Sequence, residues 1–524
     1  MRHKKVIIIG AGPAGLTAGY KLLQQSAEYE VVIIEESDVS GGISRTVFHN
    51  GNRMDIGGHR FFSKDNAVNA MWDELMPIQG YPSFDDLKLK RNIELNSNGP
   101  NPEKTDKVML LRNRISRIYY KHHFFDYPVK MNFNTICNLG LLTTFTAGIS
   151  YLKSLLAKKP EISLENFYIN RFGYKLYSLF FENYTEKLWG RHPKVISADW
   201  GAQRVKGLSI LTLFKNIFTQ LLPERQRKKC HIETSLIEKF RYPKFGPGQL
   251  WEITAKKFEK MGGKIIYNCR AEKFKQNDGK ITEIICSRNG AYENLTADII
   301  ISSMPLKNLI SGINNVPPEI ANIASGLPYR DFVTVGLLFK KINLKNKTTF
   351  KTLNNIVPDC WIYVQDPGIK LGRIQVFNNW SPYMVNDPEN TIWLGLEYFC
   401  SENDNFWIKN NDELKNFAAA ELTQMGIINA DETILDCHVE KIKKAYPAYF
   451  DTYKDIDKVI KYLNSFENLY CIGRNGQHRY NNMDHSMVTA FEAVKHIIAN
   501  DGTDKKAIWN VNTEKEYHEE QKSK

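Results

Sequence analysis

The sequence predicts an α/β protein in which a parallel sheet flanked by helices is interrupted by a helical unit and by a separate antiparallel sheet. Three observations predict this fold. The chain opens with a strand–helix–strand pattern, short apolar runs typical of buried strands recur far downstream, and two longer strand patterns stand apart from them. At 524 residues the chain is also too long for one hydrophobic core, so two or three folded units are expected.

The opening pattern lies within the first part of the chain. Residues 6–9 form a short, continuous apolar run, which is typical of a parallel strand buried on both faces. Residues 14–25 then show helical periodicity, and residues 31–34 form a second buried strand. Together these segments predict a βαβ unit.

The later strand patterns fall into two groups. Short apolar strands like the first are expected at residues 262–267, 297–303 and 469–472, the last of them followed by a helix at 487–498. Strands of a separate sheet are expected at residues 332–339 and 391–399. The polar stretch 96–107 predicts a surface loop, and helical patterns dominate from there to about residue 240.

Composition narrows the class of partner. The formal net charge is +12 and the sequence pI is about 9.0, which favours an anionic partner but does not choose among a nucleotide, a nucleic acid and a membrane surface. The eight cysteines contain no CxxC pair and no metal-ligand spacing, so no metal site is predicted. Scattered free thiols are typical of a cytoplasmic protein.

The longest apolar stretch is residues 136–156. It contains Asn138, Lys153 and several hydroxyl side chains, whereas a membrane span needs roughly 20 apolar residues without charge. We therefore expect a buried helix of a bundle here, in preference to membrane contact.

A glycine-rich motif joins the first predicted strand to the first helix. Residues 10–15 match G-x-G-x-x-G, in which Gly10 permits a tight turn, Gly12 lets the backbone approach a pyrophosphate, and Gly15 allows close helix–strand packing. Glu35 ends the second strand, where its carboxylate can accept ribose hydroxyls and would repel the 2′-phosphate of NADP. The cofactor contacts predicted here are Gly10, Gly12, Pro13, Ala14, Gly15, Glu35 and Glu36.

Proteins that bind NAD or FAD share this first unit, and the following residues distinguish them. A glycine doublet, Gly41–Gly42, comes after the second strand, and residues 55–59 read Asp-Ile-Gly-Gly-His. On these motifs the chain resembles the flavoprotein superfamily of amine oxidases, protoporphyrinogen oxidases, phytoene desaturases and UDP-galactopyranose mutases. The resemblance implies a Rossmann-like FAD-binding domain. The further cofactor contacts that it implies are Gly41, Gly42, Gly57, Gly58, His59, Gly473, Arg474, Met483, Asp484 and Ser486.

Within this superfamily the details are most similar to the UDP-galactopyranose mutases, particularly the longer form known from eukaryotes. The sequence Trp-Ile-Tyr at 361–363, with Arg373 ten residues later, resembles their clamp for uridine diphosphate, although Trp380 stands where the mutases carry a tyrosine. The substrate contacts that the resemblance implies are Tyr127, Trp189, Arg204, Trp361, Tyr363, Arg373, Tyr446 and Tyr480. The catalytic residues that it implies are His59, Arg204 and Arg373.

These residue types suit a nucleotide-sugar diphosphate. Arginines make charge-assisted hydrogen bonds to phosphates, and tyrosines add hydroxyl donors on rigid rings. The resemblance implies that reduced FAD attacks the sugar through N5 and that pyranose and furanose forms interconvert without net redox change. NADH and NADPH are then the candidate reductants of the flavin, and cell-surface polysaccharide synthesis is the expected process.

Two other functions stay open on the sequence. One is an FAD-dependent oxidoreductase of the amine oxidase, protoporphyrinogen oxidase or desaturase type, for which the basic charge and residues 136–156 would serve peripheral membrane contact. The other is a flavin-binding protein without turnover. The expected partner is a nucleotide sugar and not a nucleic acid, and the sequence predicts no oligomeric state.

The resemblance also sets the expected domain limits. The FAD-binding domain is expected to be discontinuous, from residues 1–107, 246–310 and 441–500. A helical substrate-cleft domain is expected at 108–245 and an antiparallel-sheet substrate domain at 311–440. Residues 501–524 are expected to form a flexible tail, because the segment is charged.

Overall fold

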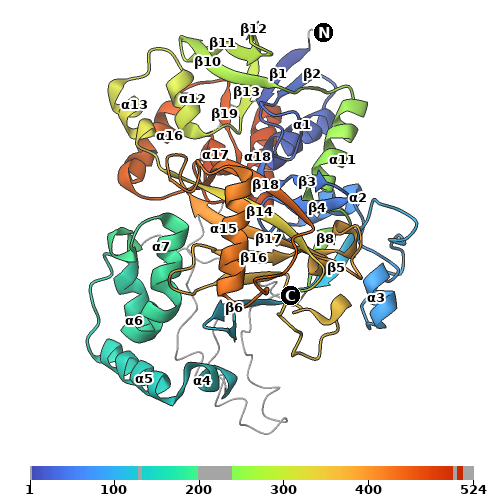
Figure 1. Ribbon diagram of the computed structural model, residues 1–524. Coiled ribbons are helices and arrows are strands. Elements are labelled where there is room, and N and C mark those ends of the chain that lie inside the picture. The colour runs from blue at the N-terminus through green and yellow to red at the C-terminus, as the bar shows by residue number, and fades with distance from the viewer. Residues whose placement is uncertain (1–2, 128–132, 199–238, 500–503, 512–524) are drawn as a thin grey trace, which may run out of the picture. The chain divides into compact units, whose positions relative to one another are not determined.

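The computed structural model describes residues 3–127, 133–198, 239–499 and 504–511, which form two compact units (Figure 1). Unit 1 comprises residues 1–111, 241–331 and 442–513, and unit 2 comprises 112–240, 332–441 and 514–524. Most of the range 108–245 and most of the range 311–440, for which the sequence predicts separate domains, thus belong to the same compact unit.

Unit 1 is built on a five-stranded parallel sheet. Its strands lie in the order β19 (Leu469–Cys471), β13 (Ile299–Ser302), β1 (Lys4–Ile9), β2 (Tyr29–Ile34) and β9 (Lys264–Ile266). The strands come from all three segments of the unit, and each was expected from its short apolar run. The predicted α/β fold class is confirmed.

Both faces of this sheet are buried. Val6 and Ile8 of β1 pack with the helices α1 (Pro13–Gln25), α11 (Pro247–Lys260) and α18 (Met483–Ala499), which lie beside the sheet in Figure 1. The alternate residues Ile7 and Ile9 pack into a second core on the opposite face. The elements of that second core are β10 (Cys269–Asn277), β11 (Lys280–Arg288), α12 (Leu306–Gly312), α13 (Pro318–Ser325) and α16 (Ile456–Asn464). Burial on both faces explains why these strands are continuously apolar.

Smaller elements complete unit 1 and its borders. These are β3 (Thr46–His49), β4 (Asn52–Asp55), α2 (Asn66–Leu75), α3 (Phe84–Leu89), β5 (Met109–Asn113), β8 (Lys239–Pro243), β12 (Ala291–Leu295) and α17 (Gly473–Gly476). Strand β3 pairs with β4, and β5 pairs with β8. Residues 96–107 contain no helix or strand, as the sequence predicts.

Unit 2 contains a seven-stranded sheet. Its order is β18 (Asp436–Pro447), β14 (Tyr329–Phe339), β17 (Ile392–Cys400), β16 (Arg373–Val376), β15 (Trp361–Val364), β6 (Ser116–Tyr120) and β7 (His123–Asp126). Strands β15, β16 and β17 are antiparallel neighbours, but β15 pairs with β6 in parallel. The expectation of a purely antiparallel sheet therefore needs this correction. Helix α15 (Asn411–Gln424) shares the apolar core of the sheet.

The range predicted to be helical is only partly so, because β6 and β7 lie within it. Their short aromatic and β-branched runs are strands because they pair with β15 and with each other. The remaining elements of unit 2 are α4 (Phe133–Leu139), α5 (Leu141–Leu156), α6 (Leu164–Tyr177), the π-helical turn Ser178–Glu182, α7 (Asn183–Trp189) and α14 (Phe377–Trp380).

The apolar stretch 136–156 is not a single buried helix. Gly140, with a φ of 81°, separates α4 from α5. In α5 only Ala147, Tyr151 and Ser154 are buried, whereas most of its leucines are exposed. The expectation of a buried bundle helix was wrong because α6 covers one narrow side of α5 and the apolar residues occupy another.

The C-terminal region also differs from its expectation. Residues 506–509 form the short helix α19 (Lys506–Trp509) inside the range predicted to be a flexible tail. Trp509 is 5 % exposed, and its indole N–H donates to the Asn464 side chain at 2.9 Å. The Lys505 ammonium donates to the carbonyls of Phe466 and Leu469. Burial of the Trp509 ring stabilises this segment against unit 1, although most of its neighbouring residues are charged or polar.

We predict that Trp509→Ala lowers the free energy of unfolding by about 3 kcal/mol, because it removes a large buried side chain. Urea-induced unfolding followed by circular dichroism measures this change. Lys506→Ala is the matched control on the same helix, since the Lys506 side chain is 79 % exposed. Equal stability of the two variants would show that α19 does not hold the end of unit 1 in solution.

Candidate functional site

The turn from β1 into α1 leaves no room for a side chain at Gly10 or at Gly15. Gly10 has a φ of 100°, and a Cβ there would lie 2.3 Å from the Ser303 hydroxyl. A Cβ on Gly15 would lie 1.9 Å from the carbonyl oxygen of Gly10. A larger residue at Gly15 would push helix α1 away from the sheet, and one at Gly10 would collide with Ser303.

A second glycine loop lies against the first. The Gly41 N–H donates to the carbonyl of Ala11 at 2.9 Å, and a Cβ on Gly42 would lie 3.3 Å from the Cα of Gly12. Gly12 is the N-cap of α1 and has no side chain to cap the free N–H groups of the first turn. The two loops therefore present backbone N–H groups and a helix N-terminus, an arrangement that suits a diphosphate.

The two acidic residues predicted to contact a cofactor lie in different surroundings. Glu35 is 8 % exposed, and its carboxylate accepts the Ala11 N–H at 2.7 Å and the Ser37 hydroxyl at 2.8 Å. The Glu36 side chain is 71 % exposed and lies 3.9 Å from Arg270. Glu35 therefore belongs to the glycine loop, where a ribose hydroxyl would exchange for its present donors, and Glu36 points away from it.

His59 is held by its ring nitrogen Nε2. This nitrogen lies 2.9 Å from the carbonyl oxygen of Ile43 and 2.8 Å from that of Ile56. Carbonyls only accept, so Nε2 carries a proton and donates to both. Burial, together with the charge of Arg474, lowers the pKa of His59 to about 4, although the two carbonyl contacts oppose this shift. The ring is therefore neutral near pH 7 and ties two backbone turns together.

Asp55 is a buried polar centre whose role the sequence does not indicate. Its carboxyl group accepts the Tyr242 hydroxyl and, at 2.8 Å, the Thr46 hydroxyl. A Cβ on Gly246 would lie 2.7 Å from the same carboxyl group. Asp55 thus joins β3, β4 and β8 to the start of α11, immediately before the turn that leads to His59.

Arg474 lies beside two stacked tyrosines. Its guanidinium is 4.9 Å from the ring centre of Tyr446 and 4.2 Å from that of Tyr480, and the two rings are 5.6 Å apart. Nη1 donates to the carbonyl of Asn481 at 3.3 Å. Nε and Nη2 are buried and have no hydrogen-bond partner among the described residues. Buried donors of this kind favour an anionic acceptor.

Gly473 places this arginine beside the glycine loops. It has a φ of 74°, and a Cβ there would lie 2.8 Å from the Cβ of Ala14 in the first turn of α1. Met483 and Asp484 begin α18, and burial raises the pKa of Asp484. The Ser486 hydroxyl donates to the carbonyl of Asn482. The predicted cofactor residues of the last segment therefore gather near the N-termini of α1 and α18, with the Ser486 hydroxyl already bonded to backbone.

Unit 2 holds a second arginine, Arg373 on β16, which is 7 % exposed. Its Nε donates to the Tyr184 hydroxyl at 2.7 Å, and its Nη1 donates to Glu397 at 3.2 Å. Burial raises the pKa of Glu397, and the charge of Arg373 opposes that rise. Sequence reasoning missed Tyr184 and Glu397, because neither belongs to a local motif.

Aromatic rings surround Arg373. Its guanidinium lies 4.9 Å from the ring centre of Trp361, which stacks on Tyr363 at 5.7 Å. Tyr127, which is 41 % exposed, stacks on Tyr363 from another side at 4.4 Å. Four of the predicted substrate residues therefore lie together in unit 2, namely Tyr127, Trp361, Tyr363 and Arg373.

The other predicted substrate residues are placed differently. Trp189 is 1 % exposed and belongs to the core of unit 2 rather than to an open surface. Tyr446 and Tyr480 lie with Arg474 in unit 1. Arg204 lies outside the described residues. Trp380, found where the mutases carry a tyrosine, is fully buried and donates to the Cys360 carbonyl.

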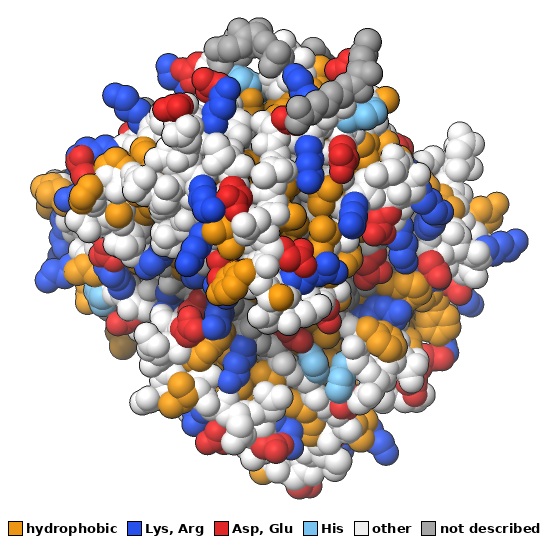
Figure 2. Space-filling view, turned by 90° about the horizontal axis from the view of Figure 1, so that it is seen from above, with side chains coloured by type: hydrophobic (Ala, Val, Ile, Leu, Met, Phe, Trp, Pro, Cys, Tyr) orange, Lys and Arg blue, Asp and Glu red, His pale blue; other side chains and the backbone are white. Residues whose placement is uncertain are grey.

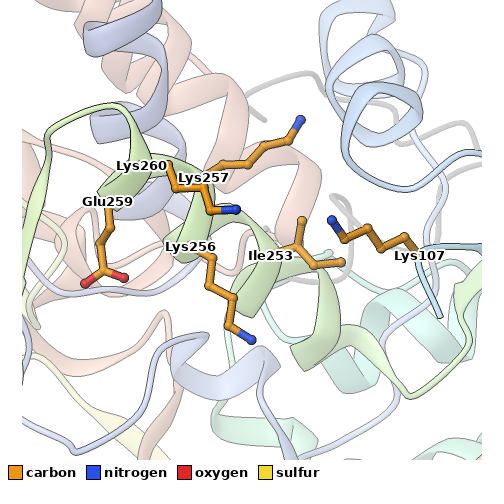
Figure 3. A pocket seen from close by; sticks show the side chains of 6 residues that line it. All are labelled: Lys107, Ile253, Lys256, Lys257, Glu259 and Lys260. Carbon is orange, nitrogen blue, oxygen red and sulfur yellow. The ribbon is translucent and has the colours of Figure 1, made fainter. Parts of the chain in front are cut away.

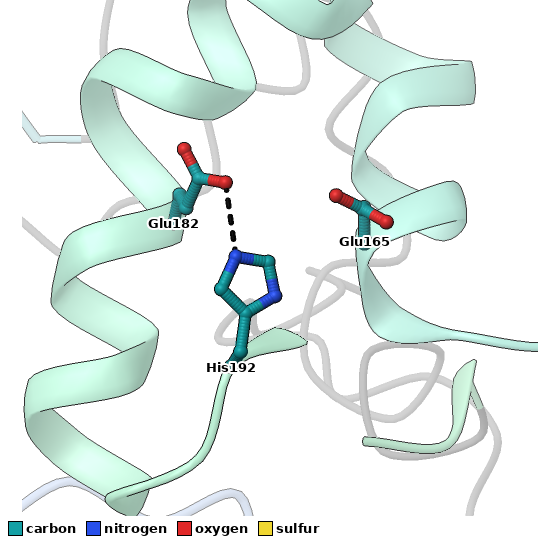
Figure 4. A group of neighbouring side chains, drawn as sticks. All are labelled: Glu165, Glu182 and His192. Atoms are coloured by element: carbon teal, nitrogen blue, oxygen red, sulfur yellow. Dashed lines mark hydrogen bonds and ion pairs between the residues drawn. The ribbon is translucent and has the colours of Figure 1, made fainter. Parts of the chain in front are cut away.

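Glu165, Glu182 and His192 form a small polar group (Figure 4), with ligand atoms within 4.8 Å of one another. Such spacing could hold a metal, but the hydrogen bonds oppose it. His192 Nδ1 accepts the Lys194 N–H at 3.1 Å, so a neutral ring carries its proton on Nε2, which lies 3.1 Å from Glu182. A metal would need a lone pair at that nitrogen. The group is better explained as a hydrogen-bonded pair beside a second carboxylate.

A surface hollow of about 410 Å³ lies along α11. It is lined by Lys107, Ile253, Lys256, Lys257, Glu259 and Lys260. Figure 3 shows that the lysine side chains point in different directions. Ligand sites are mostly apolar with a few convergent polar groups, so this hollow is not the candidate site.

Residues 13–439 match the family model described as flavin containing amine oxidoreductase. No curated protein matches the chain. The solved structure of reduced UDP-galactopyranose mutase is 22 % identical with a TM-score of 0.75, covering 98 % of this chain and 100 % of that one.

Two further solved structures share the fold. A protein provisionally described as a protoporphyrinogen oxidase, from Exiguobacterium sp. 255-15, is 14 % identical with a TM-score of 0.65 and covers 96 % of this chain and 100 % of its own. Putrescine oxidase with bound putrescine is also 14 % identical, with a TM-score of 0.57 and coverage of 95 % and 99 %. Identities this low show the common fold alone.

We predict that Asp55 makes the stability of the protein depend on pH. Burial raises the pKa of Asp55 from 3.8 to about 7. A carboxyl group whose folded pKa is raised stabilises the fold fully below the unfolded value and loses this contribution as pH rises through the folded one. Between pH 4 and 7 the free energy of unfolding should therefore fall by up to about 1.4 kcal/mol per pH unit relative to Asp55→Asn.

Denaturant titrations of both proteins across this pH range measure the difference. Asp412→Asn is the control, because the side chain of Asp412 is 85 % exposed. Parallel pH profiles for the wild type and Asp55→Asn would contradict a protonated Asp55 in the folded state.

Proposed function

Because the chain belongs to the family of flavin containing amine oxidoreductases, we propose that it uses bound FAD to interconvert the pyranose and furanose forms of a nucleoside-diphosphate sugar. The observation that carries this proposal is the group of Arg373, Trp361, Tyr363 and Tyr127 in unit 2. An arginine beside stacked aromatic rings offers N–H groups that can donate to an anion, together with flat surfaces on which a nucleotide base can stack. The fold shared with UDP-galactopyranose mutase supports the same proposal.

The family implies FAD, and unit 1 has the features to hold it. Gly12 and Gly42 leave backbone exposed at the start of α1, and Glu35 stands at the end of β2 for the ribose. The buried Nε and Nη2 of Arg474 are donors for an anionic oxygen. When bound and reduced, FAD would supply the nucleophile for the anomeric carbon of the sugar.

His59 contributes position rather than proton transfer. Its Nε2–H is used by the carbonyls of Ile43 and Ile56, and its lowered pKa keeps it neutral. A neutral ring with its only N–H engaged fixes the backbone that follows the glycine doublet at 57–58. We therefore assign His59 to shaping the cofactor site.

Arg373 is oriented before any ligand arrives. Tyr184 and Glu397 each accept one of its hydrogen bonds, which fixes the guanidinium plane against Trp361. A fixed guanidinium loses little conformational entropy when it meets a phosphate. A diphosphate bound there would share the positive charge with Glu397.

The same ion pair supports a second candidate function. Glu397 compensates the charge of Arg373, so this group also suits a substrate without phosphates. Oxidation of an organic substrate by bound FAD is therefore the alternative, in line with the oxidoreductase family and the fold shared with putrescine oxidase.

Catalytic turnover under two redox conditions distinguishes the two functions. We predict that protein reduced with dithionite without oxygen converts a UDP-hexopyranose to the furanose form, with many products formed per reduction. Anion-exchange chromatography of the nucleotide sugars measures both forms. Testing dTDP- and GDP-hexoses as well covers other nucleotides. Absence of furanose product throughout, together with reduction of the oxidised flavin by an amine, a porphyrinogen or a polyene, would overturn the mutase in favour of the oxidoreductase.

Nucleotide binding tests the role of Arg373 directly. We predict that the double variant Arg373→Gln/Glu397→Gln binds UDP roughly ten- to hundredfold more weakly, because a charged hydrogen bond to phosphate contributes about 1.5–3 kcal/mol. Replacing both partners leaves no buried charge alone. Isothermal calorimetry measures the affinity.

The matched control is Arg117→Gln/Asp359→Asn. Arg117 and the buried Asp359 form an ion pair at 2.5 Å in the same unit. This control should bind UDP like the wild type, and both variants should keep their flavin. Equal affinity in the Arg373 variant and the wild type would remove Arg373 from the nucleotide site.

A further inference from the structure

Helix α5 has an apolar face that no other described part of the chain covers. We call this the α5 apolar face and define it by six residues, Leu141, Leu142, Phe145, Ile149, Leu152 and Leu156, all of them exposed. Leu156 is 90 % exposed and Leu141 is 81 % exposed. Spacings of three and four residues place them along one side of the helix. Monomeric proteins rarely expose a continuous apolar stripe of this kind without using it.

The opposite side of α5 is fixed to α6 by close backbone packing. A Cβ on Gly173 would lie 2.7 Å from the backbone nitrogen of Tyr151, and the Lys175 N–H donates to the Ser150 hydroxyl at 3.0 Å. Ala147 and Ser154 are the other buried contacts. The packing of α5 on α6 therefore uses the small side chains on one side of the helix. This packing leaves the apolar side of α5 exposed.

The charged residues in the segment that carries the face have one sign. From residue 127 to residue 160 the sequence contains four lysines and no aspartate or glutamate. Lys153, Lys158 and Lys159 are exposed, one within α5 and two just after it. By contrast, the face shown in Figure 2 carries acidic side chains among its lysines and arginines. The net charge of +12 adds to this local field.

We propose that the α5 apolar face docks on the surface of a membrane that contains anionic lipids. Apolar side chains would enter the region between headgroups and acyl chains, while the lysines at the edge and end of the helix meet lipid phosphates. Helix α5 would lie in the plane of the surface, since no described helix is long and apolar enough to cross a membrane. This docking is separate from the chemistry proposed above and applies to either candidate function.

A second copy of the chain suits the face less well. A two-fold interface repeats the same patch on both sides, so lysines would face a patch that contains no acidic residue. Anionic headgroups supply the missing opposite charge. The apolar stripe and the one-signed charges thus favour the same occupant.

Sedimentation with vesicles tests the proposal on the full-length, FAD-containing protein. The vesicles contain phosphatidylcholine alone or with one quarter phosphatidylglycerol. The test variant is Leu142→Ser/Phe145→Ser/Leu152→Ser. The matched control is Tyr292→Ser/Ile408→Ser, because both residues are apolar side chains that are similarly exposed elsewhere. All five changed side chains, three on α5 and two in the control, are at the surface, and circular dichroism checks that each variant keeps its fold.

We expect the wild type and the control to bind the anionic vesicles and the α5 variant to bind at least about tenfold more weakly, since each apolar side chain lost from the interface weakens partitioning. Lys153→Gln/Lys158→Gln/Lys159→Gln should weaken binding to the anionic vesicles and leave binding to pure phosphatidylcholine unchanged.

Three results would overturn the proposal. The first is no vesicle binding by the wild type. The second is a concentration-dependent dimer that the α5 variant abolishes without any vesicle binding, which would make the face an interface between copies. The third is vesicle binding that the α5 variant retains, which would place the contact elsewhere, including residues 199–238 outside the described chain.

Discussion

The structure depends on one steric constraint, the close approach of three backbone segments around the first turn of α1. Gly15 and Gly10 bring helix and strand together, Gly42 brings the loop after β2, and Gly473 brings the segment after β19. At each position a Cβ would collide with, or press on, the neighbouring segment. Backbone groups rather than side chains therefore line the start of α1, and the sheet and helix fix the positions of their N–H groups, which is the arrangement that suits the proposed cofactor site.

Two of the buried carboxyl groups, those of Asp55 and Glu397, are accommodated in different ways. Asp55 accepts hydroxyl hydrogen bonds and has a pKa raised by burial, so it can stay neutral. Glu397 instead pairs with Arg373. Both arrangements avoid an unpaired buried charge, which would be strongly destabilising. The first holds together the turn before His59, and the second fixes an arginine among aromatic rings.

Local sequence was enough to predict the parallel strands, the glycine loops and Glu35, because their periodicity and spacing are properties of short segments. It was not enough for Tyr184, Glu397 or the partners of Asp55, whose roles arise only when segments distant in sequence meet. The exposure of α5 could not be predicted from the sequence either, because an apolar helical pattern does not show how much of the helix a neighbouring element covers. Arg204, predicted to contact the substrate, lies outside the described residues, so its role stays a prediction.

The three-segment construction of unit 1 has a consequence for synthesis on the ribosome. Strands β1 and β2 are made first, but their neighbours β13 and β19 come about 300 and 470 residues into the chain. The Asp55–Tyr242 bond likewise closes across 187 positions. Contacts between segments so distant in sequence form slowly, and the edges of the apolar strands stay unpaired in the nascent chain until then. The parallel sheet, and the glycine loops that it positions, therefore cannot be complete until the last strand has been synthesised.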